Sequence, residues 1–383
     1  MVVYLDNAAT TWPKPAEVIE AVKDCLENKG ANPGRGGHRL SLEAGHVLLE
    51  TRERIATLFG IPDPLRVIFT LNATDAINIG LRGVLSPGDH VVTTSMEHNA
   101  AARPLYYLAK EGVEVTWVQA DSSGLVDPDD IKKSLRPNTK MIFLNHASNV
   151  CGTVQPAIEV GQIAREAGVI FFLDAAQSAG YLDIKVDDLK VDLMAFPGHK
   201  GLYGPQGTGG LYVGPGVNLR PLRVGGTGSS SEDLEQPPIL PDLLESGTPN
   251  TPGIAGLGAG IKYLLGKGVA RLRAQTEKLL DTLLNGLAEI PKVKVIGPAR
   301  ERERVPVVSF LVEGLDPSEV AFVLDKVYNI AVRPGLHCAP LAHKTLGTFP
   351  AGTVRASLSS MNTESDIEAL LNAITQICQE IAR

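Results

Sequence analysis

The apolar positions in the first two thirds of the chain follow two alternating patterns. Short, almost wholly apolar runs are typical of strands that are buried on both faces. They lie at 66–70, 90–94, 113–118, 140–145 and 169–174. Longer stretches with apolar residues every three or four positions predict amphipathic helices. They lie at 15–30, 41–60 and 157–168, with a turn and helix at 71–85. This alternation predicts a mainly parallel sheet covered by helices on both faces.

The pattern changes after residue 213. Residues 214–252 are rich in Gly, Pro and Ser, and a connection of that length is usually functional. One long helix is expected at 253–290. Further strands are expected at 293–297, 305–312 and 330–334, and further helices at 317–327 and 364–382. The sequence therefore predicts an α/β protein with a large domain at 15–255 and a smaller α+β domain formed by 1–14 and 256–383.

Composition and charge narrow the class of protein. The chain has 383 residues, of which 44% are hydrophobic and 21% are charged, as in a globular enzyme. A net charge of −7 argues against a surface for nucleic acid or anionic lipid. No apolar run approaches the ~20 residues of a membrane span, and the first residues do not resemble a signal peptide. We expect a cytoplasmic protein that binds neither nucleic acid nor membrane.

The cysteines do not form a metal or disulfide pattern. There are four, Cys25, Cys151, Cys338 and Cys378, and no two are spaced as a CxxC pair, so no zinc site is expected. Cys25 and Cys378 fall on helical patterns, where a cysteine is usually a small buried hydrophobic residue. Cys338 differs because it lies in the loop segment LHCAPLAHKTLGTFP.

Polar residues gather where the predicted strands end. Asp174 ends the strand 169–174, and Lys200 follows in the glycine-rich run 195–210. Taken alone, Asp174 could be a helix cap and Lys200 a surface charge. Other polar residues occupy equivalent places: Thr74, His98, Asn149, Gln177 and His199. Because ligands bind at the carboxyl ends of parallel strands, this set predicts a ligand site.

A lysine and an aspartate in one site suit pyridoxal 5′-phosphate. The lysine forms a Schiff base with the cofactor aldehyde, and the carboxylate keeps the pyridine nitrogen protonated. Thr74 and Asp75 lie where a helix begins after the strand 66–70. The N-terminus of a helix binds phosphate well, so backbone N–H groups and a hydroxyl at this point are expected to hold the cofactor phosphate.

Nine segments resemble enzymes of the class V aminotransferase fold, and most closely the cysteine desulfurase and selenocysteine lyase branch (NifS- and SUF-like). They are LDNAATT (5–11), FTLNATDAIN (69–78), MEHNA (96–100), SNVCGTVQP (148–156), FLDAAQSAG (172–180), GHKGLYGPQGTGGLYV (198–213), ESGTPNT (245–251), RPGLHCAP (333–340) and VRASLSSMNT (354–363). The resemblance covers nearly the whole chain in the family's order. It implies a pyridoxal-phosphate-dependent transferase of fold type I.

The resemblance also implies a role for each site residue. Lys200 would bind the cofactor and move protons, Asp174 would pair with the pyridine nitrogen, and His98 would stack on the ring. Further cofactor contacts are implied for Ala73, Thr74, Asn149, Gln177 and His199, and for Thr248, which would reach the cofactor of the other protomer of a homodimer. Arg355 would bind the substrate carboxylate as a bidentate fork. Asn149, Arg35 and His38 are implied near the substrate.

Cys338 matches the position of the family's catalytic cysteine. A loop thiol beside His337 and cations could be ionised and nucleophilic. The implied reaction converts L-cysteine to L-alanine and leaves the sulfur on Cys338 as a persulfide. A sulfur-acceptor or scaffold protein would then take the sulfur for iron–sulfur cluster biogenesis.

The match has departures, and other functions stay open. Pro197 stands where many relatives have a serine that contacts the phosphate, and Asn72 stands where glycine is frequent. The short segment from Cys338 to Arg355 is more like the SUF-type branch. The alternatives are a selenocysteine lyase, a class V aminotransferase or cyst(e)ine β-lyase, and a non-catalytic binding protein with this fold.

Overall fold

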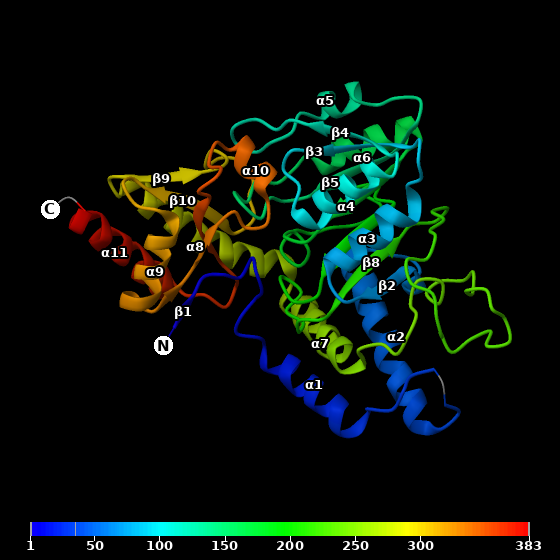
Figure 1. The fold of residues 1–383 in the computed structure, drawn as a ribbon. Helices are drawn as coiled ribbons and strands as arrows, with labels where there is room; N and C mark the ends of the chain where they lie inside the picture. Colours follow the sequence, from blue (N-terminus) through cyan, green and yellow to red (C-terminus); the bar gives the residue numbers. More distant parts are fainter. Residues whose placement is uncertain (1, 35, 382–383) are drawn as a thin grey trace.

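The largest sheet has seven strands and a mainly parallel arrangement, as the sequence predicts (Figure 1). The computed structural model describes residues 2–34 and 36–381. The strands, in spatial order, are β2 (Val67–Thr70), β8 (Gly209–Val213), β7 (Leu193–Pro197), β6 (Ile170–Asp174), β5 (Thr139–Asn145), β3 (His90–Thr94) and β4 (Glu114–Val118). Only β8 runs against its neighbours, β2 and β7.

Five of these strands coincide with the predicted apolar runs, and β7 and β8 are additional. Pro197 ends β7, and Gly209 and Gly210 open β8. Proline and glycine weaken the sequence signal of a strand, which explains why the pattern alone missed both. The segment from Gly198 to Lys200 directly follows β7, so its predicted place at a strand end is confirmed.

Helices cover both faces of this sheet. Successive residues of β6 belong to opposite apolar clusters, because strand side chains alternate between faces: Phe171 and Leu173 to one, Phe172 to the other. The first face is covered by α2 (Arg39–Phe59), α6 (Ala157–Ala167) and α7 (Thr251–Lys267). The second is covered by α3 (Ala73–Val84) and α4 (Asn99–Lys110). Two further helices are α1 (Ala16–Asn28), which packs on α7, and α5 (Pro128–Lys133).

The stretch 253–290 is helical, as expected, but it is not one continuous helix. The segment forms α7 and a second helix, α8 (Val269–Glu289), with Gly268 between them at φ 82°. A positive φ is readily adopted by glycine, so the chain changes direction there. The side chains of α7 join the core of the large sheet, whereas most buried residues of α8 join the C-terminal core.

The C-terminal part contains a second, antiparallel sheet. Its strands, in spatial order, are β12 (Arg333–Gly335), β13 (Thr353–Ser357), β10 (Val307–Val312) and β9 (Val293–Ile296). Its helices are α9 (Pro317–Tyr328), α10 (Pro340–Thr345) and α11 (Glu364–Ile381). The N-terminal strand β1 (Val3–Tyr4) pairs with β11 (Ile330–Ala331), so both chain ends lie in this part of the molecule (Figure 1). The domain boundaries given above stay a prediction.

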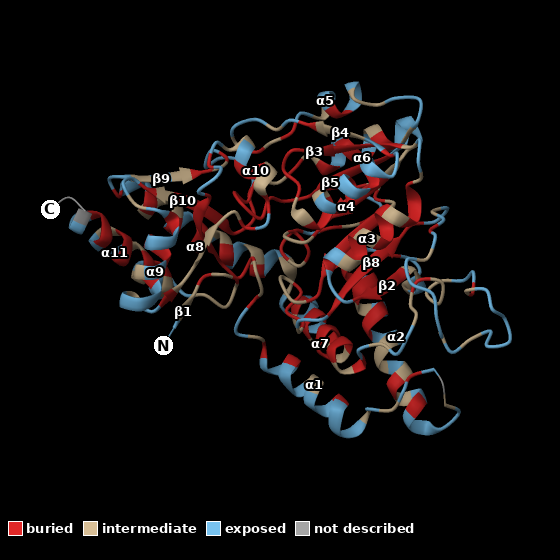
Figure 2. Ribbon diagram, viewed as in Figure 1, coloured by how far each residue is buried: buried red, intermediate tan, exposed pale blue. Residues whose placement is uncertain are grey.

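The connection from β8 to α7, residues 214–250, is long and largely exposed (Figure 2). One of its residues, Glu245, accepts hydrogen bonds from the Phe69 backbone N–H and the Arg52 guanidinium, each at 2.5 Å. Arg52 belongs to α2 and Phe69 to β2, so this contact ties the connection to the large sheet. Among the described helices, none is long and apolar enough to cross a membrane.

Candidate active site

The predicted cofactor residues meet at the carboxyl edge of the large sheet. Asp174 is the last residue of β6 and pairs in register with Ala195 of the neighbouring strand β7. Lys200 follows the end of β7 after a short turn. The parallel pairing of β6 and β7 therefore brings the carboxylate and the amine to the same edge, as the sequence predicts.

Burial shifts the pKa of both groups toward the neutral form. Asp174 is 2% exposed, and its Oδ1 accepts a hydrogen bond from the backbone N–H of Ala176 at 2.9 Å. Burial raises the pKa of Asp174 to about 6, although that hydrogen bond and Lys200 oppose the change. Burial lowers the pKa of Lys200 to about 8, although Asp174 opposes it. A lysine amine with a lowered pKa suits Schiff-base chemistry.

His98 caps α4 beside these groups. Its Nδ1 accepts a hydrogen bond from the backbone N–H of Ala100 at 3.0 Å, which fixes the ring. Burial, followed by the nearby charge of Lys200, lowers the pKa of His98 to about 3. The ring is therefore neutral at physiological pH and can lie against an aromatic cofactor.

Two buried polar atoms point to an additional ligand. The Oδ1 of Asn149 and the Nδ1 of His199 are buried and have no hydrogen-bond partner among the described residues. Burial, then Lys200, lowers the pKa of His199 to about 4. Gln177 lies at the same edge and donates from Nε2 to the carbonyl oxygen of Ala8 at 3.1 Å. Because buried polar atoms are normally paired, these atoms suit a polar cofactor.

The expected phosphate site is the first turn of α3. Ala73 and Thr74 begin this helix, and the Oδ1 of Asn72 caps it by accepting from the Asp75 N–H at 2.9 Å. The side chain of Asn72 is thus occupied by the helix cap. Thr74 is exposed at the start of this helix, so its side chain is accessible to a bound phosphate.

Glycines near Lys200 allow the chain to pack closely against itself. A Cβ atom at Gly198 would lie 2.1 Å from Thr208 Oγ1, and one at Gly201 would lie 2.3 Å from the Ala179 carbonyl oxygen. Their effect on Lys200 is indirect, through the shape of the turn that carries it.

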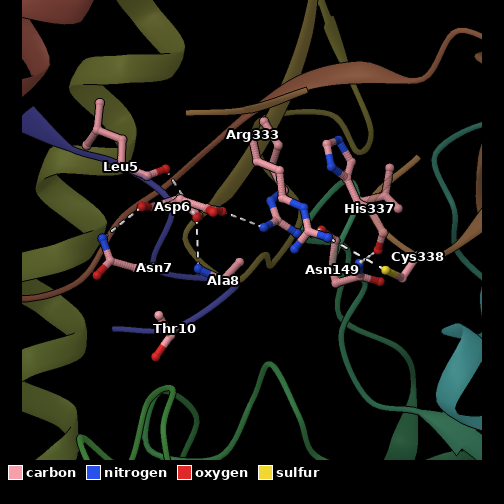
Figure 3. Close-up of polar contacts among 12 residues, drawn as sticks. Leu5, Asp6, Asn7, Ala8, Thr10, Asn149, Arg333, His337 and Cys338 are labelled. Carbon is pink, nitrogen blue, oxygen red and sulfur yellow. Dashed lines mark hydrogen bonds and ion pairs between the residues drawn. The ribbon is translucent and has the colours of Figure 1, made fainter. Parts of the chain in front are cut away.

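Arg355 is held in a buried network on β13. It is 1% exposed, its Nη2 lies 2.7 Å from Oδ1 of Asp6, and its Nη1 donates to the carbonyl oxygen of Asn149 at 3.0 Å. Figure 3 shows Asp6 and Asn149 on opposite sides, so the guanidinium that contacts both of them is held between them. Burial lowers the pKa of Arg355, while the Asp6 carboxylate opposes that change. A buried, oriented guanidinium can bind a carboxylate strongly.

Cys338 is exposed and lies close to Asn149 (Figure 3). Arg333 donates from Nη2 to its Sγ at 3.6 Å. The carbonyl oxygen of Cys338 accepts a hydrogen bond from the backbone N–H of Asn99 at 2.8 Å, and Asn99 is the residue after His98. The thiol is therefore next to the predicted cofactor edge and beside the permanent cation of Arg333.

The ring of His337 makes its hydrogen bond with Thr353, and none with Cys338, among the described residues. Its ring is buried, and its Nε2 is 3.0 Å from Oγ1 of Thr353. Burial, followed by the charge of Arg355, lowers the pKa of His337 far below its usual range. The cation at the thiol is Arg333.

Two other predicted residues, His38 and Thr248, are not brought to this edge within the described chain. His38 is exposed and caps α2, with its Nδ1 accepting from the Ser41 N–H at 3.2 Å. The connection between α1 and α2 lies at the opposite end of the molecule from α10 (Figure 1). Arg35 lies outside the described residues. Thr248 is exposed and lines a cavity with Arg52 and Thr70, whereas Lys200 does not line it.

The residues present fit pyridoxal phosphate. A buried carboxylate, a lysine of lowered pKa and a neutral histidine occupy one edge of the sheet, as described above. The unpaired atoms of Asn149 and His199 offer it further hydrogen bonds. Among the described residues, no group of His, Cys, Asp and Glu is arranged to hold a metal ion.

A family model described as Aminotransferase class-V matches residues 3–370. The chain belongs to this family. A probable cysteine desulfurase of Methanothermobacter thermautotrophicus is 37% identical over 98% of this chain and 94% of its own length. An apo cysteine desulfurase structure from Thermococcus onnurineus NA1 is 36% identical, with a TM-score of 0.93 over 99% of this chain and 95% of that chain.

These similarities confirm the predicted fold and enzyme class. The cysteine desulfurase CsdA from Escherichia coli, in an S-sulfonic acid form, is 29% identical with a TM-score of 0.88, covering 99% of this chain and 95% of that chain. The shared fold is α/β with a mainly parallel central sheet, which is fold type I of the pyridoxal-phosphate enzymes. Class V aminotransferases are a pyridoxal-phosphate-dependent family.

Two residues of the site were not singled out by sequence reasoning: Asp6 and Arg333. Each lies inside a segment that carries the family resemblance. Two features of the sequence could have identified them: each is charged, and each lies in a segment that also holds a predicted site residue or matches the family. Their partners could not be predicted, since Asp6 and Arg355 are 349 positions apart.

Proposed function

We propose that this chain is a pyridoxal-phosphate-dependent cysteine desulfurase that converts L-cysteine to L-alanine and retains the sulfur on Cys338. The observation that carries the proposal is the exposed Cys338 thiol, 3.6 Å from Arg333 and adjoining the edge that holds Lys200 and Asp174. An aminotransferase has no need of a nucleophilic cysteine at this position. The names of the relatives support the same activity.

In this proposal the cofactor is held by the residues at the strand ends. Lys200 would bind it covalently, Asp174 would pair with its ring nitrogen, and His98 would lie against the ring. Asn149, Gln177 and His199 would supply hydrogen bonds, with Ala73 and Thr74 at the phosphate. The bound cofactor supplies an acceptor for the electron pair that forms at the substrate Cα.

The protein's own groups would then act in sequence on the substrate. Arg355 binds the carboxylate and thereby orients the amino acid. Lys200, whose pKa of about 8 leaves a share of the amine neutral, takes the proton from Cα. The sulfur of Cys338, which lies beside Arg333, attacks the substrate Sγ and gives up its proton. A sulfur–sulfur bond forms and the Cβ–Sγ bond breaks. A proton is then added at Cβ, and Lys200 returns a proton to Cα, which gives alanine.

The partners follow from the same proposal. We propose a homodimer, in which Thr248 contacts the cofactor site of the second copy. The connection 214–250 carries the exposed apolar residues Val224, Leu234 and Ile239, which are 72%, 107% and 63% exposed, and such residues are suited to a subunit interface. We also propose L-cysteine or L-selenocysteine as substrate, a sulfur-acceptor or scaffold protein, and a cytoplasmic location.

The location of the sulfur after one turnover tests this function. Protein loaded with pyridoxal phosphate would be mixed with one equivalent of L-cysteine without reductant and digested for mass spectrometry. We expect one added sulfur atom on the peptide that contains Cys338 and one equivalent of alanine. The peptides that contain Cys25, Cys151 and Cys378 serve as internal controls. Pyruvate without a persulfide would contradict the proposal and indicate a β-lyase.

A further inference from the structure

Asp6 lies at the start of the chain and contacts the arginine that we assign to substrate binding. Its Oδ1 is 2.7 Å from Nη2 of Arg355, and this is the one ion pair of Arg355 in the part of the chain that the structure describes. The two side chains differ in exposure, 1% for Arg355 and 23% for Asp6. The Asp6 side chain is therefore partly open to solvent, whereas the arginine that it contacts is buried.

The backbone around Asp6 is fixed to the strand that carries Arg355. Asp6 forms a bridge with Ser357 of β13, two residues beyond the arginine. The N–H of Asn7 donates to the Ser357 carbonyl oxygen at 3.3 Å, and the N–H of Ala8 donates to Ser357 Oγ at 2.8 Å. Because both partners are attached to one strand, their relative position is rigid, as a preorganised site requires.

Asp6 does not use up the donors of Arg355. A guanidinium has five N–H donors, and the hydrogen bonds to Asp6 and Asn149 use two of them. The Nε atom is buried and has no hydrogen-bond partner within the described residues. Three donors therefore remain for a second carboxylate.

Asp6 is the carboxylate that acts most strongly on Arg355, and it offsets the like charge of Arg333 there. Lys200 is a further like charge, and its own carboxylate neighbour is Asp174. Without Asp6 the guanidinium would be a buried cation facing two other cations. It would then turn toward another acceptor or toward water, because an unpaired buried charge is unfavourable.

We propose that Asp6 is a positioning residue for substrate selection: its carboxylate holds the Arg355 guanidinium so that the remaining N–H groups receive the carboxylate of the substrate. This inference rests on the proposed function. It assigns to the N-terminal segment a part in recognising α-amino acids, as distinct from amines that lack a carboxylate.

The test is the variant Asp6→Asn in the holoenzyme, with alanine formation as the assay. Losing a charged hydrogen bond to the buried arginine should raise KM for L-cysteine about tenfold or more, with a smaller change in kcat. Cysteamine, which has the same thiol and amine but no carboxylate, would be measured as a competitive inhibitor. Its inhibition constant should change less than about twofold, because the arginine does not contact it.

Two further variants separate positioning from folding. Asp6→Glu keeps the charge and should recover part of the loss in KM. Asp183→Asn removes a carboxylate from an exposed pair with Lys185, 3.0 Å apart, and should leave both constants unchanged. If Asp6→Asn does not fold, Asp6→Glu carries the test alone, through the same comparison of L-cysteine with cysteamine.

The outcomes distinguish this inference from the proposed function. If wild type makes alanine while Asp6→Asn keeps its KM, the inference is overturned and the desulfurase remains. If KM for L-cysteine and the inhibition constant of cysteamine rise by the same factor in Asp6→Asn, Asp6 has a general structural role and the inference is also overturned. Absence of alanine from wild type would overturn the proposed function itself.

Discussion

At the scale of single residues, the carboxyl group of Glu97 is the most deeply buried acid near the site. It is 0% exposed, and its Oε1 accepts hydrogen bonds from Thr94 Oγ1 at 2.7 Å and from the Asn145 N–H at 3.2 Å. Burial raises the pKa of Glu97 to about 8, although those hydrogen bonds oppose the change. The group therefore keeps its proton at neutral pH.

This pKa makes a prediction about stability and pH. The folded chain retains a proton that the unfolded chain releases above its ordinary glutamate pKa, so wild type loses stability as pH rises toward about 8. Glu97→Gln removes this titration and copies the neutral acid in shape. Its free energy of unfolding, relative to wild type, should rise by more than about 1 kcal/mol between pH 5 and pH 8.

Urea unfolding of both proteins across that range measures the difference. The exposed Glu235→Gln is the matched control and should show no such trend. A difference between Glu97→Gln and wild type that does not depend on pH would mean that Glu97 is ionised in the folded protein. A fall in the free energy of unfolding of Glu97→Gln relative to wild type between pH 5 and pH 8 would contradict the prediction outright.

At the scale of elements, one ion pair anchors the connection between β8 and α7. The Arg52 side chain is 5% exposed and that of Glu245 is 17% exposed, so the pair is largely desolvated. The Arg52 guanidinium also hydrogen-bonds the Val67 carbonyl oxygen and lies 4.3 Å from the centre of the Phe69 ring. Removing Glu245 would leave a buried cation without its carboxylate.

We therefore expect Glu245→Ala to lower the free energy of unfolding by about 3 kcal/mol. The exposed Glu235→Ala in the same connection should change it by less than about 0.5 kcal/mol. Denaturant unfolding measures both values, and hydrogen exchange of the Phe69 amide, which donates to Glu245, should become faster in Glu245→Ala alone. Equal values for the two variants would show that the ion pair does not hold the connection.

Elements were predictable where the sequence signal is local. The strand β3 has the predicted bounds, and the helix α6 differs from its prediction by one residue, because hydrophobic period and end signals lie within a few residues of each other. The strands β7 and β8 were missed because proline and glycine occur in them. The break at Gly268 was missed because a single glycine inside a helical pattern is compatible with either a helical or a positive φ, and the sequence does not distinguish the two.

At the scale of the whole molecule, the candidate site combines three distant parts of the chain. The N-terminal segment supplies Asp6, the large sheet supplies Asp174 and Lys200, and the C-terminal sheet supplies Arg355 with Cys338 nearby. The strand-end rule and the family resemblance identified most of these residues. Neither could show that Asp6 meets Arg355 or that Arg333, and not His337, faces the thiol, since those contacts arise from packing between parts.

The central claim is that Cys338 accepts the sulfur, and one paired assay tests it most directly. Wild type and Cys338→Ala, both loaded with pyridoxal phosphate, would receive L-cysteine with a thiol reductant, and alanine, sulfide and pyruvate would be quantified. We predict that wild type releases alanine and sulfide in equal amounts. We predict that Cys338→Ala keeps its visible cofactor absorption but forms no alanine. Equal alanine formation by both proteins, or pyruvate in place of alanine, would contradict this account.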